Sequence, residues 1–240
     1  MTSWGSTENG DPAFDTSWLK NLQDVNLIIT KNLSDWMIDR LMEYKDKCVL
    51  HLTVTGFGGS FLEPGVPRVD YNARQLKKLL EFGFPSSQAV LRIDPMISEY
   101  IAEQILDEFK DSGVTRVRLS FLNLTNYTSN EISDEDIAAH IKDTTKLVNH
   151  SKEMKYNYTF ESCAGPWLKV PGVELRGCMN EKEAKNLGVN DVEFQHGKRN
   201  RDFCLAPLNR VEMLEGHKCL HNCKYCFLGI GGANNLGGCK

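Results

Sequence analysis

The chain has 240 residues, of which 41% are hydrophobic and 25% are charged, and its formal net charge is −4. This balance is typical of a globular protein and excludes a disordered or fibrous chain. The small negative charge also excludes a strong global attraction to nucleic acid or to an anionic membrane surface.

The N-terminal residues carry no targeting signal. Residues 1–6 lack the basic and apolar segments of a secretory signal peptide, and no apolar run is long enough to span a bilayer. Eight cysteines in 240 residues are too few for a secreted disulfide scaffold. We therefore expect a cytoplasmic protein without a membrane segment, in which clustered cysteines are more often metal ligands or redox groups than disulfides.

The N-terminal two thirds of the chain alternate between strand and helix patterns. Residues 1–17 are polar and are predicted to form a flexible arm, and residues 18–165 are predicted to form a βα-repeat domain. Within it, the predicted strands cover residues 25–30, 48–54, 89–93, 114–121 and 158–161. The predicted helices cover residues 33–44, 76–82, 98–112 and 133–148.

Short connections between alternating strands and helices are typical of parallel βα units. We predict the α/β class and a partial (β/α) TIM-like barrel whose cysteine loop lies at the C-terminus. Functional groups in such a fold lie at the C-terminal ends of the strands, where this chain carries Lys31, Thr55 and Arg92.

The pattern weakens in the last third of the chain. Residues 166–228 are predicted to form a cysteine-rich segment that holds a metal-binding loop, with a short helix at 181–187. Residues 229–240 are rich in glycine and are predicted to form a flexible tail.

Three cysteines near the C-terminus form the most specific motif of the sequence. Cys219, Cys223 and Cys226 are separated by three and then two residues, and Tyr225 directly precedes the last. One tight loop with this spacing presents three thiolates to a single centre, and thiolates select zinc or iron–sulfur clusters over hard metals. A 4Fe-4S cluster held by three thiolates keeps one iron open, and that iron can chelate S-adenosylmethionine. This spacing is identified as the radical S-adenosylmethionine motif.

Other interpretations of the cysteine motif are open. A zinc site could use the three thiolates with His217 or His221 as the fourth ligand, and the segment would then be a zinc knuckle that binds nucleic acid. A cluster could also be purely structural or transfer electrons only. A disulfide is disfavoured by the reducing compartment.

Several further segments resemble those of spore photoproduct lyase-like radical S-adenosylmethionine proteins. They are Thr30-Lys31-Asn32, Thr53-Val54-Thr55, residues 62–67 and residues 92–97. In that family the cysteine loop precedes these segments, whereas here it comes last. The chain therefore looks like a circularly permuted member in which residues 210–214 supply the first strand. The Asp-Pro-Ala segment at 11–13 and the terminal motif are also similar to those of a bacterial and phage family.

The resemblance implies an enzyme whose cofactors are a 4Fe-4S cluster and S-adenosylmethionine. Reductive cleavage of S-adenosylmethionine would give a 5′-deoxyadenosyl radical that abstracts a hydrogen atom from the substrate. The resemblance further implies an external one-electron donor of the flavodoxin or ferredoxin type. It favours a thymine-derived base in DNA or a nucleotide as substrate, for example in a phage thymidine-hypermodification isomerase that acts in the host cytoplasm.

Five residues are candidates for binding the cofactor. The Glu63 carboxylate could hold the ribose or amino group of S-adenosylmethionine, or Glu63 could be a turn residue. Lys31 and Arg92 could bind a carboxylate, or form ion pairs inside the barrel mouth. Thr55 could hydrogen-bond the adenine, or reflect strand propensity alone. Tyr225 is included because it lies within the cysteine motif.

Outside the motif, three scattered cysteines and one basic run are of interest. Cys163 is our candidate for a catalytic hydrogen-atom donor, and Cys178 and Cys204 could hold a second metal centre with it. Each could equally be a small buried apolar side chain. The basic run at 198–201 could contact a phosphate, although such runs are commonly solvated surface.

Overall fold

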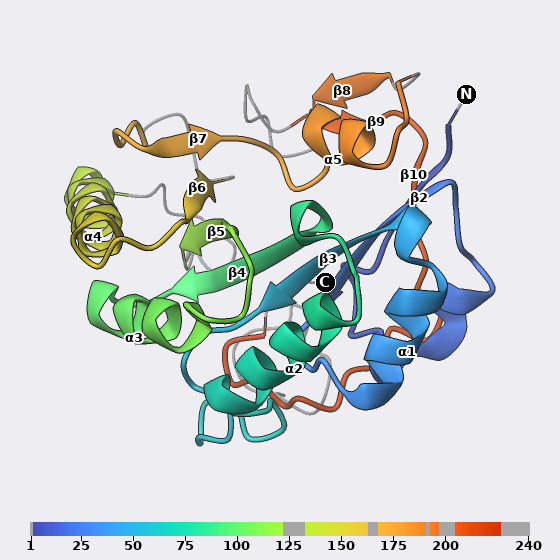
Figure 1. The fold of residues 1–240 in the computed structure, drawn as a ribbon, viewed down its shortest axis with the longest axis horizontal. Coiled ribbons are helices and arrows are strands. Elements are labelled where there is room, and N and C mark those ends of the chain that lie inside the picture. The colour runs from blue at the N-terminus through green and yellow to red at the C-terminus, as the bar shows by residue number, and fades with distance from the viewer. Residues whose placement is uncertain (1, 122–132, 163–167, 191–192, 197–204, 227–240) are drawn as a thin grey trace.

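A parallel β-sheet forms the centre of the molecule (Figure 1). The computed structural model describes residues 2–121, 133–162, 168–190, 193–196 and 205–226. The sheet has eight strands in the order β10-β1-β2-β3-β4-β5-β6-β7, and every pair in it is parallel. The predicted α/β class is confirmed. Within the described residues, β10 and β7 are the two edges, so the sheet is open and a closed barrel is not observed.

The strand bounds, in their order across the sheet, are Arg210–Glu212 (β10), Trp4–Ser6 (β1), Val25–Thr30 (β2), Cys48–Thr53 (β3), Ala89–Met96 (β4), Arg116–Phe121 (β5), Thr159–Ser162 (β6) and Val173–Leu175 (β7). Two further short strands, Phe194–His196 (β8) and Leu205–Pro207 (β9), form a separate antiparallel pair.

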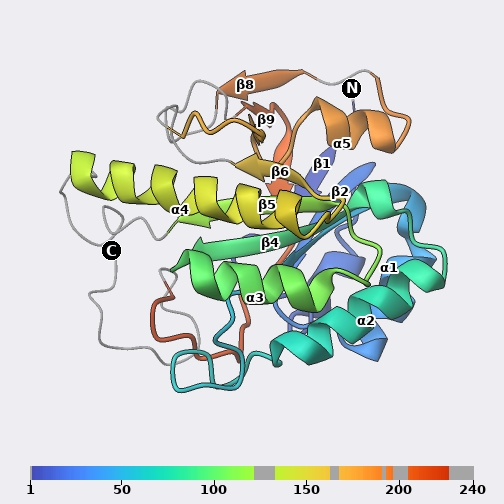
Figure 2. The same cartoon turned by 60° about the vertical axis from the view of Figure 1, so that its left-hand side comes forward.

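Helices cover the two faces of the sheet unequally. The helices are Asp35–Glu43 (α1), Val69–Glu81 (α2), Glu99–Phe109 (α3), Asp134–Glu153 (α4) and Glu181–Asn186 (α5). Helices α1 to α3 lie below the sheet in Figure 2, while α5, β8 and β9 lie above it. None of the helices in the described ranges is long and apolar enough to cross a membrane.

Serine caps begin three of these helices where the sequence predicts a helix start. The hydroxyls of Ser34, Ser98 and Ser133 accept hydrogen bonds from the backbone N–H groups three residues later. Such caps satisfy otherwise unpaired donors and stabilise a helix by about 1 kcal/mol each. The local sequence therefore fixes where α1, α3 and α4 begin.

The two faces of the sheet have opposite chemistry because side chains alternate along each strand. On the helix-covered face, apolar residues of β3, β4 and β5 join one large core with α1 to α4. Val25, Leu27 and Val49 point the other way and pack with Trp4 and with the α5 region in a second, smaller core. Toward the C-terminal ends of the strands, this second face carries polar side chains, among them His51, Thr53, Arg118 and Glu161. We call this side of the sheet the concave face.

Strand β4 is longer than the sequence predicts. It continues to Met96 through Pro95, where the prediction ends it at residue 93. Proline cannot donate to a strand ladder, and the pairing of β4 with β5 is irregular between Ile93 and Met96. The missing N–H therefore falls where the regular ladder is already interrupted.

Both ends of the chain contribute to one edge of the sheet. The predicted strand at 210–214 is confirmed as β10, which pairs in parallel with β1. The prediction of a flexible arm at residues 1–17 is wrong for residues 4–15, because β1 lies between β10 and β2 and Trp4, Thr7 and Asp11 are buried. A strand of three residues has no periodicity that a sequence pattern can detect.

Candidate active site at the cysteine loop

The cysteine loop lies against the loop that follows β3. The Gly65 N–H donates to the His221 carbonyl oxygen at 3.0 Å, and the Lys224 N–H donates to the Leu62 carbonyl oxygen at 2.9 Å. A Cβ atom on Gly65 would lie 2.4 Å from the Leu220 carbonyl oxygen, so only glycine allows this close approach. The two loops, about 160 residues apart in sequence, therefore form one structural unit.

The three thiols of the motif lie in this unit. Cys223 is buried, and Cys219 and Cys226 are half-buried. Burial raises the pKa of Cys219 to about 11 and that of Cys223 to about 12, with smaller contributions from Cys226 to both and from Cys219 to Cys223. In the described ranges, no three His, Cys, Asp or Glu side chains already surround a point where a metal ion could bind.

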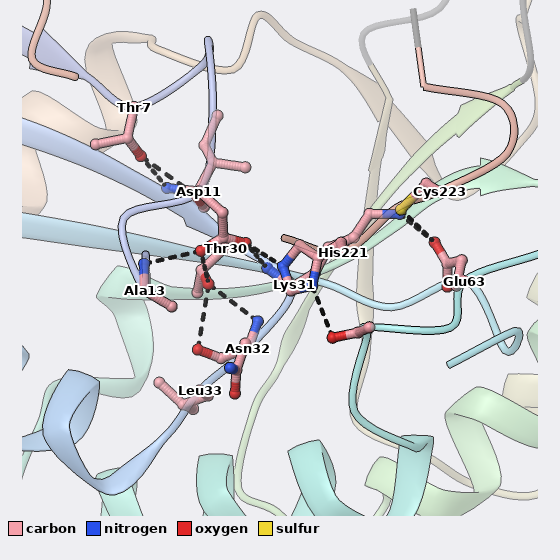
Figure 3. A network of polar contacts seen from close by, with 12 residues as sticks. Thr7, Asp11, Ala13, Thr30, Lys31, Asn32, Leu33, Glu63, His221 and Cys223 are labelled. Atoms are coloured by element: carbon pink, nitrogen blue, oxygen red, sulfur yellow. Dashed lines mark hydrogen bonds and ion pairs between the residues drawn. The ribbon is translucent and has the colours of Figure 1, made fainter. Parts of the chain in front are cut away.

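Glu63 is the centre of a polar cluster directly beside Cys223. Its carboxylate is fully buried and accepts hydrogen bonds from Lys31, Thr55 and Tyr225. The Lys31 ammonium group is also 3.1 Å from the Tyr225 hydroxyl oxygen and 3.8 Å from the Cys223 Sγ. The Cys223 Sγ lies 3.8 Å from Glu63 Oε1 (Figure 3). We call Lys31, Thr55, Glu63, Tyr225 and Cys223 the loop cluster.

Lys31 and Glu63 are charged within this cluster. Burial lowers the pKa of Lys31, but the Glu63 carboxylate raises it further, to a value above the ordinary range. Burial raises the pKa of Glu63, but the Lys31 charge and the hydrogen bonds to the carboxylate lower it below its ordinary value. The pair therefore presents one cation and one anion next to a motif cysteine.

Asp11 fastens the cysteine loop to the end of β2. Its carboxylate accepts hydrogen bonds from the Thr30 hydroxyl at 2.7 Å and the Lys31 N–H at 2.9 Å. The His221 Nε2 lies 2.7 Å from the same carboxylate, and the His221 Nδ1 lies 3.0 Å from the Gly65 carbonyl oxygen (Figure 3). Both ring nitrogens of His221 are therefore occupied.

Sequence reasoning did not assign these roles to Asp11 and His221. The segment Asp11-Pro12-Ala13-Phe14 was predicted to dock the N-terminal arm and to resemble a bacterial and phage family, without a contact to the cysteine loop. A signal was present in its local chemistry, because the Asp11 carboxylate accepts the Ala13 N–H at 2.9 Å in a turn that is typical of aspartate.

The structure brings together most of the predicted site residues. Lys31, Thr55, Glu63 and Tyr225 form the loop cluster, and Cys219, Cys223 and Cys226 lie on the adjoining loop. Arg92 pairs with Asp94 at the end of β4.

Several other predicted residues do not join the site. Cys163, Cys204 and the basic run at 198–201 lie outside the described residues. Cys178 is partly buried against the smaller core and lies near Arg118, whose pKa it influences.

A second group of charged residues lies on the concave face, and of its members sequence reasoning named only Glu161, as a polar residue at the end of a predicted strand. Arg116 Nε and Nη2 lie 3.0 and 3.1 Å from the two carboxylate oxygens of Glu161, and Arg118 also pairs with Glu161. Glu183 of α5 pairs with Arg116, and the Lys182 Nζ lies 3.2 Å from Glu161. Helix α5 thus closes a buried ion-pair network over β5 and β6.

The comparisons with known proteins identify a family. A family described as a domain of unknown function (DUF1848) matches residues 12–228, and the chain therefore belongs to this family. The comparison with curated proteins gives no significant match. The chain is similar to a crystal structure of 2,3-dimethylmalate lyase, a PEP mutase/isocitrate lyase superfamily member, at 8% identity and a TM-score of 0.36. The similarity covers 78% of this chain and 61% of that one.

Proposed function

We propose that this member of the DUF1848 family is a radical S-adenosylmethionine enzyme. The observation that carries the proposal is the position of the motif cysteines beside a buried, oppositely charged pair. The Cys223 Sγ is 3.8 Å from both the Lys31 ammonium nitrogen and a Glu63 carboxylate oxygen. A structural metal site does not require a cation and an anion next to one of its ligands.

The donor set fits a cluster that is held by three protein ligands. Cys219, Cys223 and Cys226 supply three thiols from one short loop. His221, the candidate fourth ligand inside that loop, has both ring nitrogens engaged with Asp11 and Gly65. His217, the other candidate, is exposed and its Nδ1 lies 3.1 Å from the Asn9 carbonyl oxygen. His221 is therefore not available as the fourth ligand, whereas the Nδ1 contact of His217 is compatible with a metal on its Nε2.

A bound 4Fe-4S cluster and S-adenosylmethionine would supply reductive cleavage and a carbon-centred radical. The chain's own residues would bind and orient the amino-acid part of S-adenosylmethionine. Its ammonium group matches the Glu63 carboxylate, and its carboxylate matches the Lys31 ammonium group. Tyr225 and Thr55 hold Glu63 in place through hydrogen bonds, so the two charged groups are oriented before the ligand binds.

The proposal extends to an electron donor and a substrate. An external one-electron donor of the flavodoxin or ferredoxin type would reduce the centre. The resemblance to the spore photoproduct lyase-like proteins supports a thymine-derived base, in DNA or a nucleotide, as the substrate class. Tyr156 and Tyr158 do not support base stacking at this site, because their hydroxyls bond to Asp107 and to the Leu106 carbonyl oxygen on α3.

Anaerobic reconstitution tests the proposed function. The protein is purified without oxygen, its iron and sulfide are counted, and 5′-deoxyadenosine is measured after addition of S-adenosylmethionine and a low-potential reductant. We expect about four irons and four sulfides per chain, as in one cubane cluster. Alanine at Cys219, Cys223 or Cys226 is expected to abolish both the cluster and the product.

A matched control separates the motif from the other cysteines. Cys178→Ala removes a described cysteine outside the loop and is expected to retain both the iron content and 5′-deoxyadenosine formation. Equimolar zinc without iron or sulfide would contradict the proposal and favour the zinc knuckle. An intact cluster that does not cleave S-adenosylmethionine would contradict it in favour of a structural or electron-transfer role.

A further inference from the structure

A row of polar side chains crosses the concave face of the sheet. The strand register places Thr53 of β3 opposite Arg92 of β4, Arg92 opposite Arg118 of β5, and Arg118 opposite Glu161 of β6. Neighbouring strands lie about 4.8 Å apart, so these four side chains are direct neighbours on one face. His51 lies on the same face of β3, two residues before Thr53.

Several atoms of this row are buried without a hydrogen-bond partner in the described part of the chain. They are both ring nitrogens of His51, the Thr53 hydroxyl, and the Nε and Nη1 of Arg118. The side chains themselves are inaccessible, at 0% exposure for His51 and Arg118 and 4% for Thr53. A buried polar group without a partner costs about 1–3 kcal/mol, so five such atoms in one place require an explanation.

The ion pairs around the row join more cations than anions. The cations of this region are Arg92, Arg116, Arg118 and Lys182, and the anions are Asp94, Glu161 and Glu183. These seven groups together carry a charge of +1.

The ionisation states of His51 and Arg118 agree with this count. Burial lowers the pKa of His51 well below its ordinary value, and the nearby charges of Arg118, Arg92 and Arg116 lower it further. His51 is therefore neutral and has one donor and one acceptor nitrogen. Burial also lowers the pKa of Arg118, but Cys178, Glu183 and Glu161 raise it above its ordinary value. Arg118 stays charged.

We propose that His51, Thr53 and Arg118 bind an oxyanion, the carboxylate or phosphate group of a ligand, on the concave face of the sheet. One negative charge would balance the excess cation. Its oxygens would accept hydrogen bonds from the Arg118 nitrogens, the Thr53 hydroxyl and the neutral His51 ring. The site requires no metal cluster and therefore does not depend on the proposed function.

The row lies close to the loop cluster, so an anion bound there has a role in the proposed radical S-adenosylmethionine reaction; this step rests on the proposed function. Thr30 and Leu52 form the last pair of β2 with β3, and Lys31 of the loop cluster and Thr53 of the row are the residues that directly follow this pair. An anion on the row would lie on the same face of the sheet as the loop cluster. The oxyanion is then an acidic group of the substrate, which this row would position toward the cysteine loop.

Anion titration of the metal-free protein tests this inference. Sodium phosphate and sodium formate are titrated separately by isothermal calorimetry at constant ionic strength, with sodium chloride as the reference. We expect saturable binding of phosphate, formate or both. Thr53→Val, which removes the hydroxyl and keeps the shape, is expected to weaken binding about tenfold or more.

A second variant and a matched control distinguish a ligand site from a structural one. His51→Leu is expected to raise the urea midpoint without anion, because it removes buried nitrogens that lack a partner, and to weaken anion binding. Thr144→Val is the control, since the Thr144 hydroxyl in α4 is also buried and unpartnered in the described chain but lies away from the row. It is expected to leave anion binding unchanged.

The outcomes decide both the inference and the source of the anion. Binding of phosphate that is weakened by Thr53→Val supports a phosphorylated ligand, and binding of formate alone supports a carboxylate. If neither anion binds to the wild-type protein, or if Thr53→Val and His51→Leu bind it as tightly as the wild type does, the inference is overturned. Because no iron is present in this experiment, its failure leaves the cysteine-loop proposal untouched.

Discussion

The loop cluster and the row of polar side chains on the concave face are both largely buried and charged, but they differ in how their polar groups are satisfied. We call this row the concave row; its members are His51, Thr53, Arg92, Arg118 and Glu161. In the loop cluster, Glu63 accepts from three donors, and Lys31 has both a counter-charge and a hydroxyl partner. In the concave row, His51 and Thr53 have no partner in the described chain. The polar groups of the loop cluster are therefore paired with one another, whereas those of the concave row include buried atoms that the proposed anion would pair.

The largest predicted effect on stability comes from removing the Glu161 carboxylate of the concave row. Glu161→Gln removes the charge that faces Arg116, Arg118 and Lys182. Breaking a buried ion pair on one side costs about 3–5 kcal/mol of unfolding free energy, because the partner charges stay buried. Urea denaturation measures this cost.

The control for this variant lies on the next strand. Glu174→Gln breaks an ion pair with Arg176 in which the glutamate side chain is 46% exposed, and it is expected to cost less than about 1 kcal/mol. A loss below about 1 kcal/mol in Glu161→Gln would mean that the row does not depend on this carboxylate.

The same carboxylate predicts a specific pH dependence. Burial raises the pKa of Glu161, but Arg118 and Arg116 lower it to about 2, against an ordinary value of 4.5. A lowered carboxyl pKa stabilises the fold above pH 4.5, and this stability is lost as the pH falls from 4.5 toward 2. The wild type is therefore expected to lose about 3 kcal/mol more than Glu161→Gln over this range. If the unfolding free energies of the wild type and Glu161→Gln fall in parallel between pH 4.5 and pH 2, the lowered pKa of Glu161 does not stabilise the fold.

A smaller effect is expected where the loop cluster depends on close backbone contact. In Gly65→Ala the new Cβ would lie 2.4 Å from the Leu220 carbonyl oxygen, so one of the two loops must move. Overpacking of this kind costs about 1–3 kcal/mol. The buried Cys223 thiol should then react faster with a thiol reagent, which measures the loss of the loop contact.

Gly83→Ala is the control for the loop contact. Gly83 has a positive φ of 96°, but no atom lies within 4 Å of its added Cβ. This variant is expected to lose stability through its backbone alone and to leave the labelling rate of Cys223 unchanged. Equal labelling of Cys223 in wild type and Gly65→Ala would show that the two loops are not held by this contact.

A feature of these two regions can be predicted from the sequence when the residues that determine it lie close together in the chain. The starts of α1, α3 and α4 are set locally by their serine caps, and the predicted helices begin within about two residues of the observed ones. The motif cysteines are close in sequence, so their common loop was also predictable. Strand β1 was missed because its three residues are defined by partners about 20 and 205 positions away.

The concave row could not be predicted for a different reason. Alternation along the strand Arg116–Phe121 shows that Arg116 and Arg118 share one face, but it does not show whether that face meets solvent or protein. The answer depends on α5, which supplies Glu183 from about 65 residues further along the chain. Local pattern therefore gives the face of a residue, and only the tertiary fold gives its burial.

The smallest predicted effect is that of Tyr225→Phe, which tests whether the loop cluster and the concave row are independent. Tyr225→Phe removes a hydroxyl that donates to Glu63 and lies 3.1 Å from the Lys31 ammonium nitrogen. Glu63 keeps Lys31 and Thr55, and the ring remains beside the Lys31 ammonium group, whose nitrogen lies 5.1 Å from its centre. We expect a loss of about 1 kcal/mol of unfolding free energy and no change in the affinity for phosphate or formate. A change in anion affinity would mean that Lys31 links the two groups into one site, because Lys31 and Thr53 directly follow the last pair of β2 with β3.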